Sequence, residues 1–411
     1  MPEFLKLIPP NEALELFLRN LAPGKVKTET IETHLSLGRT ISTPVVSSEY
    51  LPPFSRSAVD GYTLIASSTF GAGDSLPAYL KVIGEIPMGR QPGFIIKSGE
   101  AALIHTGGML PDNADAVVML EQTQPGSPGE IEIQKAVAKG ENVIFKGEDI
   151  QPGQEVLSAG IRIRPAEIGG LLALGITEVE VARVPRIGVI SSGDEVVPPS
   201  DRLVLGQVRD VNSYSLGAMI TLQGGIPVPY GIAPDRADVL YSMAFKALSE
   251  CDMIVVTAGS SASSRDLTSN VIRRLGQPGV LVHGINIKPG KPTILAVCDG
   301  KPVIGLPGNP VSALVISWLF LKPVIDLLTG LKHVNPRPSI PARLNVNVSS
   351  LAGREDWLPV KLIPTNDGWL AEPIFFKSNL IFSLSRADGM ICVPAPATGL
   401  QKDDSVMVML F

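Results

Sequence analysis

The stretch 304–314, IGLPGNPVSAL, joins one apolar run to a second, VISWLFL, so the chain has to reverse direction within a few residues. Pro307 and Pro310 flank Gly308 and Asn309 in this turn. Because proline fixes φ and is favoured at the first helical position, the pattern predicts a strand, a stiff turn and a helix beginning at Pro310. The free N–H groups of such a helix start form a site for an anion. The turn is equally explained as a helix start that binds nothing.

The stretch lies near the end of a region, residues 182–330, in which apolar strand-like runs alternate with helical patterns. The strand-like runs are PRIGVISS, IPVPYGIA, CDMIVVTAG and KPVIGLPG, with NSYSLGAMITL and ADVLYSMAFKALSE as helical segments between them. This alternation is typical of a doubly wound α/β domain with a mainly parallel sheet covered on both faces. Ligands of such sheets bind at the carboxyl ends of the strands.

The rest of the chain has a different pattern of apolar and turn-forming residues. Residues 46–145 consist of short β-rich pieces separated by turn clusters such as FGAGD and TQPGSPGE, which predicts a β-rich inserted domain. The flanking segments 1–45 and 146–181 are expected to form one discontinuous unit around it. After the proline-rich HVNPRPSIPAR, residues 335–411 are expected to form a small C-terminal β-domain.

Composition excludes several classes of protein. The 411 residues are 45% hydrophobic and 18% charged, which indicates a globular chain, and the net charge of −5 argues against a nucleic-acid binder. The three cysteines form no CxxC pair and the four histidines no metal-ligand spacing. The N-terminus resembles no export signal. The uncharged run 303–321 is interrupted by LPGNP, and the part after Pro310 is expected to be too short to cross a bilayer. We therefore expect a cytoplasmic protein with no membrane contact.

Polar residues follow the predicted strands and suggest the chemistry of the site. Anion-binding groups alternate with carboxylates there, a mixture that suits a phosphorylated ligand held with Mg²⁺. Singly, each has an ordinary explanation as a turn former, a helix cap or a solvated lysine. The sequence contains no GxxxxGK[ST], GxGxxG or GxSxG motif, which disfavours P-loop NTPases, dinucleotide dehydrogenases and α/β-hydrolases. The residues concerned are Asp194, Glu195, Asp235, Ser261, Asp266, Lys288, Lys291 and Ser312.

Five motifs together resemble one family. PPFSRSAVDGY (52–62), SSGDE (191–195), TAGSSASSRD (257–266), INIKPGKP (285–292) and LPGNPVSA (306–313) are similar to those of molybdopterin molybdenumtransferase, the MoeA and gephyrin E-domain family. The resemblance extends over nearly the whole chain. It implies an elongated homodimer of four-part subunits, with an elongated discontinuous domain and a C-terminal β-barrel. It also implies an enzyme that inserts molybdate into adenylylated molybdopterin and releases AMP, the final step of molybdenum cofactor biosynthesis.

The resemblance also implies roles for individual residues. Asp60 and Thr106 would reach across the dimer into the partner's site, although an Asp-Gly pair such as Asp60-Gly61 is most often a simple turn. The expected metal ligands for Mg²⁺ are Glu195, Asp235 and Asp266, and Lys288 and Lys291 would complete the catalytic set. The substrate and molybdate would be bound by Ser261, Gly308, Asn309, Ser312, Arg354 and Ser378.

Three positions depart from the family pattern. Ser263 replaces a usual glycine, Gly284 stands where some members have a lysine, and Lys377 replaces a glycine before Ser378. Two alternatives to molybdate insertion remain open at this point: a homologue that inserts tungstate, and a molybdopterin-binding carrier or scaffold that does not hydrolyse its ligand.

Overall fold

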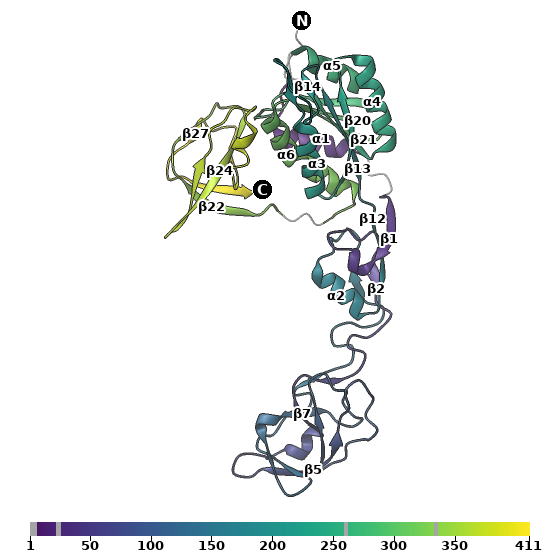
Figure 1. The fold of residues 1–411 in the computed structure, drawn as a ribbon. Helices are drawn as coiled ribbons and strands as arrows, with labels where there is room; N and C mark the ends of the chain where they lie inside the picture. Colours follow the sequence, from purple (N-terminus) through teal and green to yellow (C-terminus); the bar gives the residue numbers. More distant parts are fainter. Residues whose placement is uncertain (1–5, 22–25, 259–261, 333–335) are drawn as a thin grey trace.

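The computed structural model describes residues 6–21, 26–258, 262–332 and 336–411, with the backbone alone for 262–266. The chain is elongated (Figure 1). A helix-covered sheet and a barrel lie side by side at one end, and a β-rich unit lies at the other end of a slender connecting segment. The fold is therefore multidomain, α/β plus β, as the sequence predicts.

The α/β region is built on a six-stranded sheet in the order β16-β13-β17-β21-β20-β18. The first four strands are parallel, and β20 and β18 are antiparallel additions that the strand–helix alternation did not reveal. The bounds are β16 (Ile226–Ala233), β13 (Arg186–Ser192), β17 (Met253–Ala258), β21 (Lys301–Pro307), β20 (Ile294–Cys298) and β18 (Pro278–His283).

Helices cover both faces of this sheet. One buried cluster joins the sheet to α1 (Pro10–Asn20), α3 (Asn212–Leu222) and α6 (Pro310–Leu328). A second cluster joins the other face to α4 (Ala237–Glu250) and α5 (Ala262–Arg273). Consecutive residues of a strand face opposite sides of the sheet, and here helices cover both sides. Every residue from Met253 to Ala258 is therefore buried, which explains the unbroken apolar runs in the sequence.

Helix α6 is longer than expected from the sequence. It begins at Pro310, as predicted, but continues through Pro323 to Leu328, and its 19 residues are long and apolar enough to cross a membrane by length and composition. Two thirds of its most apolar window is buried inside the protein. Its buried residues belong to the same cluster as α1 and α3, so α6 packs as a core helix.

The slender segment consists of two parts of the chain that are far apart in sequence. Strand β1 (Thr28–Glu32) pairs with β12 (Glu178–Ala182) over its whole length, and β2 (Val45–Val46) pairs with β11 (Glu155–Leu157). Helix α2 (Pro165–Ala173) is followed by Gly175 at φ +71°, a conformation that glycine favours at helix ends.

At the opposite end, the β-rich unit contains a second six-stranded sheet, in the order β7-β4-β6-β5-β9-β8. Its strands are β4 (Gly61–Leu64), β5 (Ala78–Glu85), β6 (Glu100–Ile104), β7 (Ala116–Met119), β8 (Thr123–Pro125) and β9 (Glu130–Ile133). Short strands β3 (Arg56–Ser57) and β10 (Val143–Ile144) pair where the chain enters and leaves the unit.

The C-terminal strands form a closed barrel. The order is β24-β25-β22-β28-β26, and β26 pairs back with β24. The bounds are β22 (Ser339–Leu344), β24 (Glu355–Thr365), β25 (Gly368–Pro373), β26 (Gly389–Val393) and β28 (Ser405–Leu410), with β23 (Val348–Ser349) and β27 (Gly399–Leu400) as an additional antiparallel pair. Strand β19 (Ile287–Lys288), which precedes β20 in the chain, pairs with the start of β24. This pairing attaches the barrel to the α/β region beside the KPGKP turn.

Candidate functional site

A cavity of about 530 Å³ lies where the α/β region meets the barrel. Its wall includes the KPGKP turn after β19, the start of α6, the residue before β24 and the segment 376–378. Six of the sequence-predicted site residues line this one cavity: Lys288, Lys291, Asn309, Ser312, Arg354 and Ser378.

The cavity has the character of an anion site. Lys288, Lys291 and Lys377 are exposed at it, and the positive end of the α6 dipole adds to their charge. Asn309 precedes α6 and its Nδ2 donates to Ser378 Oγ at 3.0 Å. This bond links the helix start to the barrel side of the cavity. The substitution at Lys377 therefore leaves Ser378 in the wall and places another cation beside it.

Asp356, which the sequence analysis did not identify, contacts two of the cationic side chains at this cavity. Its carboxylate is 3% exposed and accepts two hydrogen bonds from Arg354, at 2.7 and 3.2 Å. Its Oδ2 also lies 3.8 Å from Lys288 Nζ. A bidentate pair of this kind fixes the plane of the guanidinium. Arg354 is therefore held in one orientation at the cavity wall.

A second cavity of about 530 Å³ shares Asn309 with the first and extends along the carboxyl ends of β13 and β17. It contains the predicted residues Glu195 and Gly308, together with residues that sequence reasoning missed: Ser191, Asp210, Asn212 and Thr257. All four lie at or just after strands. In the sequence alone, each has an ordinary structural explanation as a strand end or a helix cap, so none indicated a binding site.

Asparagine is a favoured N-cap residue, so the sequence predicts Asn212 as the cap of this helix, but its side chain makes no capping hydrogen bond to α3. Ser213 N–H donates instead to Asp210 Oδ1 at 3.0 Å, while Asn212 Nδ2 donates to the Gly308 carbonyl at 2.9 Å. Asn212 Oδ1 is buried without a hydrogen-bond partner. A buried acceptor of this kind is satisfied when a donor enters the cavity.

Three carboxylates gather beside this second cavity. Asp194 Oδ1 accepts a hydrogen bond from Asp235 N–H at 3.0 Å, and Ser192 Oγ lies 3.4 Å from Asp235 Oδ1. Burial raises the pKa of Asp235 above its ordinary value, and the Asp194 and Glu195 charges raise it further. Within the described residues, no three His, Cys, Asp or Glu side chains are already arranged as a metal site. Ser261 and the side chains of Ser263 and Asp266 lie outside the described part of the chain.

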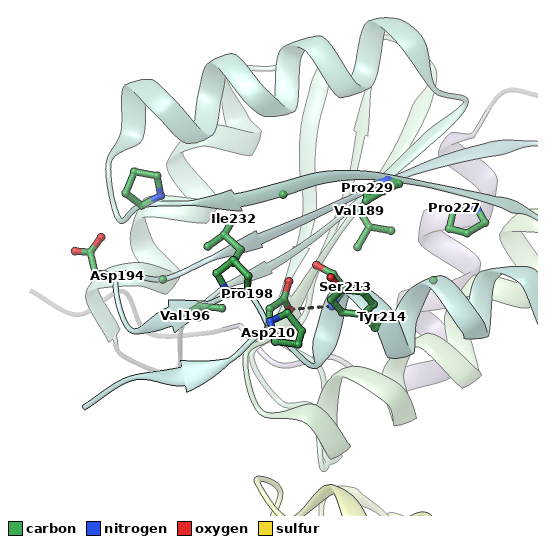
Figure 2. Close-up of a pocket in the computed structure, with 15 residues that line it drawn as sticks. Val189, Asp194, Val196, Pro198, Asp210, Ser213, Tyr214, Pro227, Pro229 and Ile232 are labelled. Atoms are coloured by element: carbon green, nitrogen blue, oxygen red, sulfur yellow. Dashed lines mark hydrogen bonds between the residues drawn. The ribbon is translucent and has the colours of Figure 1, made fainter. Parts of the chain in front are cut away.

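A third cavity, of about 760 Å³, lies between α3, β16 and the short strands β14 (Val196–Val197) and β15 (Val208–Arg209). Figure 2 shows its walls, which include Val189, Pro227 and Ile232, with Tyr214 from α3. It shares Val196 and Asp210 with the second cavity. It is the most apolar of the three, and of the residues predicted at the strand ends Asp194 lines it.

Asp60 and Thr106 lie together, but in the β-rich unit at the far end of the chain (Figure 1). Asp60 Oδ1 accepts hydrogen bonds from Thr106 N–H at 2.7 Å and Thr106 Oγ1 at 3.2 Å. The backbone hydrogen bond is the main reason why the pKa of Asp60 lies below its ordinary value. Within one chain, this pair is not brought to the cavities.

The backbone conformation explains why Gly284 stands where some family members have a lysine. Gly284 has φ +107°, and its N–H donates to the Thr293 carbonyl at 2.9 Å. Residues other than glycine rarely adopt this conformation, so a lysine at this position would strain the backbone found here.

Comparisons with known proteins agree with this architecture. Residues 8–175 match the MoeA N-terminal region (domain I and II), residues 188–327 match a probable molybdopterin binding domain, and residues 341–411 match the MoeA C-terminal region (domain IV).

Individual relatives match over almost their whole length. The molybdopterin molybdenumtransferase of Nostoc sp. is 34% identical, covering 95% of this chain and 91% of the relative. The enzyme of the same name from Staphylococcus epidermidis is 31% identical, covering 94% and 92%. The crystal structure of the molybdopterin biosynthesis MoeA protein from Pyrococcus horikoshii OT3 superposes with a TM-score of 0.85 at 30% identity, covering 99% of this chain and 100% of that one. The chain belongs to the MoeA family of molybdopterin molybdenumtransferases.

Proposed function

We propose that this protein is a molybdopterin molybdenumtransferase that inserts molybdate into adenylylated molybdopterin and releases AMP. The observation that carries the proposal is the convergence of six predicted residues on one cationic cavity, next to a second cavity bordered by carboxylates. A cationic pocket suits phosphate and molybdate, which are both tetrahedral oxyanions. The proposal places the reaction in the cytoplasm.

Mg²⁺ is the proposed cofactor, and the donor set fits it. Asp194, Glu195 and Asp235 offer only oxygen ligands, which hard cations prefer. Burial and then the charges of Asp194 and Glu195 raise the pKa of Asp235, and a bound cation would offset this repulsion between like charges. Glu195, Asp235 and Asp266 would hold the ion, with the remaining ligands from water and the substrate's phosphates. When bound, it would withdraw charge from the phosphoanhydride.

The chain's own residues would bind and polarise the two anions. Lys288, Lys291 and the α6 N-terminus would stabilise the negative charge that grows as the P–O bond to AMP breaks. Arg354, Ser312 and Ser378 would orient molybdate from the opposite wall. Asn212 Oδ1 would accept a hydrogen bond from a ring N–H or amino group of the pterin. Water supplies the oxygen that replaces AMP, so no covalent intermediate with the protein is needed.

The site is proposed to be completed by a second subunit. Asp60 lies too far along the elongated chain to reach its own cavity (Figure 1), and the surface around it is acidic, with Glu85, and apolar, with exposed Met88 and Leu120. The cavity segment has the complementary character, with Lys377 between exposed Phe375 and Phe382. In a homodimer, the β-rich unit of one subunit would dock at the cavity of the other.

The test is AMP release from adenylylated molybdopterin by the purified protein, with molybdate and tungstate in parallel and with Mg²⁺ omitted as a control. Mg²⁺-dependent release with molybdate supports the proposal. Preferential release with tungstate would make the protein a tungstate-inserting enzyme. Ligand binding without release would make it a carrier or scaffold and refute the proposed reaction.

Asp235→Asn is expected to lower Mg²⁺-dependent AMP release more than about tenfold, because a carboxylate ligand is lost. It is not expected to lower the melting temperature in Mg²⁺-free buffer. A carboxyl whose pKa is raised by folding costs stability as the pH rises through that pKa, and asparagine removes this cost at neutral pH.

The matched control is Asp238→Asn, an exposed aspartate in the first turn of α4 whose carboxylate pairs with Arg236. It should leave Mg²⁺-dependent release unchanged. Release by Asp235→Asn equal to that of the wild type at every Mg²⁺ concentration would remove Asp235 from the cation site.

A further inference from the structure

His105 occupies the middle of a row of three titratable side chains in the β-rich unit. It follows β6, and the two neighbouring strands supply a carboxylate at the same edge of the sheet: Glu85 ends β5 and Asp60 precedes β4. His105 Nε2 lies 3.1 Å from Glu85 Oε1, and Nδ1 lies 3.6 Å from Asp60 Oδ1. The ring therefore has one nitrogen facing each carboxylate.

The chemistry of these groups limits the form of the ring that fits. An ionised carboxylate only accepts hydrogen bonds, so Nε2 has to carry a proton toward Glu85. A neutral ring then presents the Nδ1 lone pair to Asp60, whereas an imidazolium presents a second N–H. Among the described residues, Asp60 and Glu85 are the charged groups within ion-pair distance of the ring. Two carboxylates on opposite sides of the ring match the doubly protonated form.

All of these contacts use the same oxygen of Asp60. Oδ1 accepts from Thr106 N–H and Thr106 Oγ1 and faces His105, while the side chain remains 56% exposed. Among the described residues, the hydrogen bonds and the ion pair of Asp60 all involve Oδ1, which leaves Oδ2 for a ligand on the partner subunit.

We infer that His105, held by Glu85, is a positioning residue that orients the Asp60 carboxylate for the site it shares with the partner subunit. This inference rests on the proposed function, because Asp60 acts only where the two subunits meet. Glu85 holds the ring at Nε2, and the ring in turn restrains Asp60 through Nδ1. Neither the family motifs nor the sequence reasoning indicated this contact.

The test compares kcat and KM of AMP release by the wild type, His105→Gln and Glu85→Gln, all as full-length protein. His105→Gln should show a kcat lowered about tenfold with little change in KM, because Asp60 is less well fixed. Glu85→Gln should lower kcat by a smaller factor, because the ring stays in place and loses only the contact at Nε2.

His34→Gln is the matched control, because His34 is another exposed histidine beside a single carboxylate, Glu32, at 3.2 Å. Its kcat and KM should match those of the wild type. ¹⁵N-histidine NMR of the same proteins gives a readout that is independent of activity, and the His105 ring resonances should move in both Glu85→Gln and Asp60→Asn, while those of His34 stay in place.

The outcomes separate the two hypotheses. No AMP release by the wild type would refute the proposed function. Normal release by the wild type, with a kcat of His105→Gln equal to that of the wild type, would refute the positioning role alone. His105 ring resonances unmoved in both carboxylate variants would refute the contacts on which that role depends.

Discussion

An equimolar mixture of the Asp60→Ala and Lys291→Ala variants is expected to release AMP at about a quarter of the wild-type rate, although each variant alone is inactive. Each homodimer of Asp60→Ala lacks the carboxylate at both sites, and each homodimer of Lys291→Ala lacks the lysine at both. In a mixed dimer, one site combines the intact Asp60 of one subunit with the intact Lys291 of the other. Random mixing makes half of the dimers mixed, and each has one intact site.

The individual losses should be large. Removing a preorganised charge that stabilises a developing anion typically costs about 10²–10³ in kcat, so Lys291→Ala alone should leave almost no background. Lys291 is exposed and makes no ion pair among the described residues, so its removal should not affect folding. Recovery on mixing can then be attributed to the shared site.

The control mixture is Lys291→Ala with Arg354→Ala. Both residues line the same cavity, so every mixed dimer has one defect in each of its sites and no activity should return. If the Asp60→Ala and Lys291→Ala mixture also stays inactive, while differently tagged subunits purify together, the site is not shared in the way we propose.

The features that the sequence predicted well are those that local chain stiffness determines. Pro310 begins α6 because proline suits the first helical position, and the apolar runs of β13, β17 and β21 form a parallel sheet because both faces are covered. The polar residues after these strands meet at one edge of the sheet for the same reason. Glu195 and Ser312 could thus be placed near one another before the structure was known, whereas Lys288 and Lys291 lie in the KPGKP segment before β20, an antiparallel strand that the alternation did not reveal.

Features that depend on contacts between distant segments could not be predicted. Asp356 reads as an ordinary strand residue, and its role appears only because β19 pairs with β24 and brings Lys288 beside it. The row of Glu85, His105 and Asp60 requires the strand order β4-β6-β5, which no local pattern specifies. Asn212 looked like a helix cap, but Asp210 takes that role and frees Asn212 for the second cavity.

Gly61→Ala is expected to destabilise the β-rich unit by about 3 kcal/mol, although Gly61 makes no contact with the proposed ligands. A Cβ at this position would lie 1.9 Å from the Val118 carbonyl oxygen and 2.8 Å from its carbon. Both atoms belong to the backbone of β7, which is hydrogen-bonded to β4, so no side chain can turn away to make room. The strands would have to separate at the point where Asp60 enters the sheet.

The measurement has to report on this unit alone. The three tryptophans, Trp318, Trp357 and Trp369, all lie in α6 or the barrel, so tryptophan fluorescence would miss the change. Hydrogen exchange followed on peptides from β4 and β7 should accelerate by about a hundredfold in Gly61→Ala, while exchange in β13 and β17 stays as in the wild type. Gly73→Ala is the matched control, since a Cβ there meets nothing within 4 Å.

Comparison with Asp60→Ala separates the two residues of the Asp-Gly pair. Asp60 is exposed and outside the strand, so its replacement should abolish AMP release while leaving the exchange of β4 and β7 unchanged. Gly61→Ala should change both, because displaced strands also displace Asp60. If Gly61→Ala left exchange and AMP release unaltered, the spacing between β4 and β7 would have room for a Cβ at position 61. The close approach of these strands would then not explain the glycine of the motif.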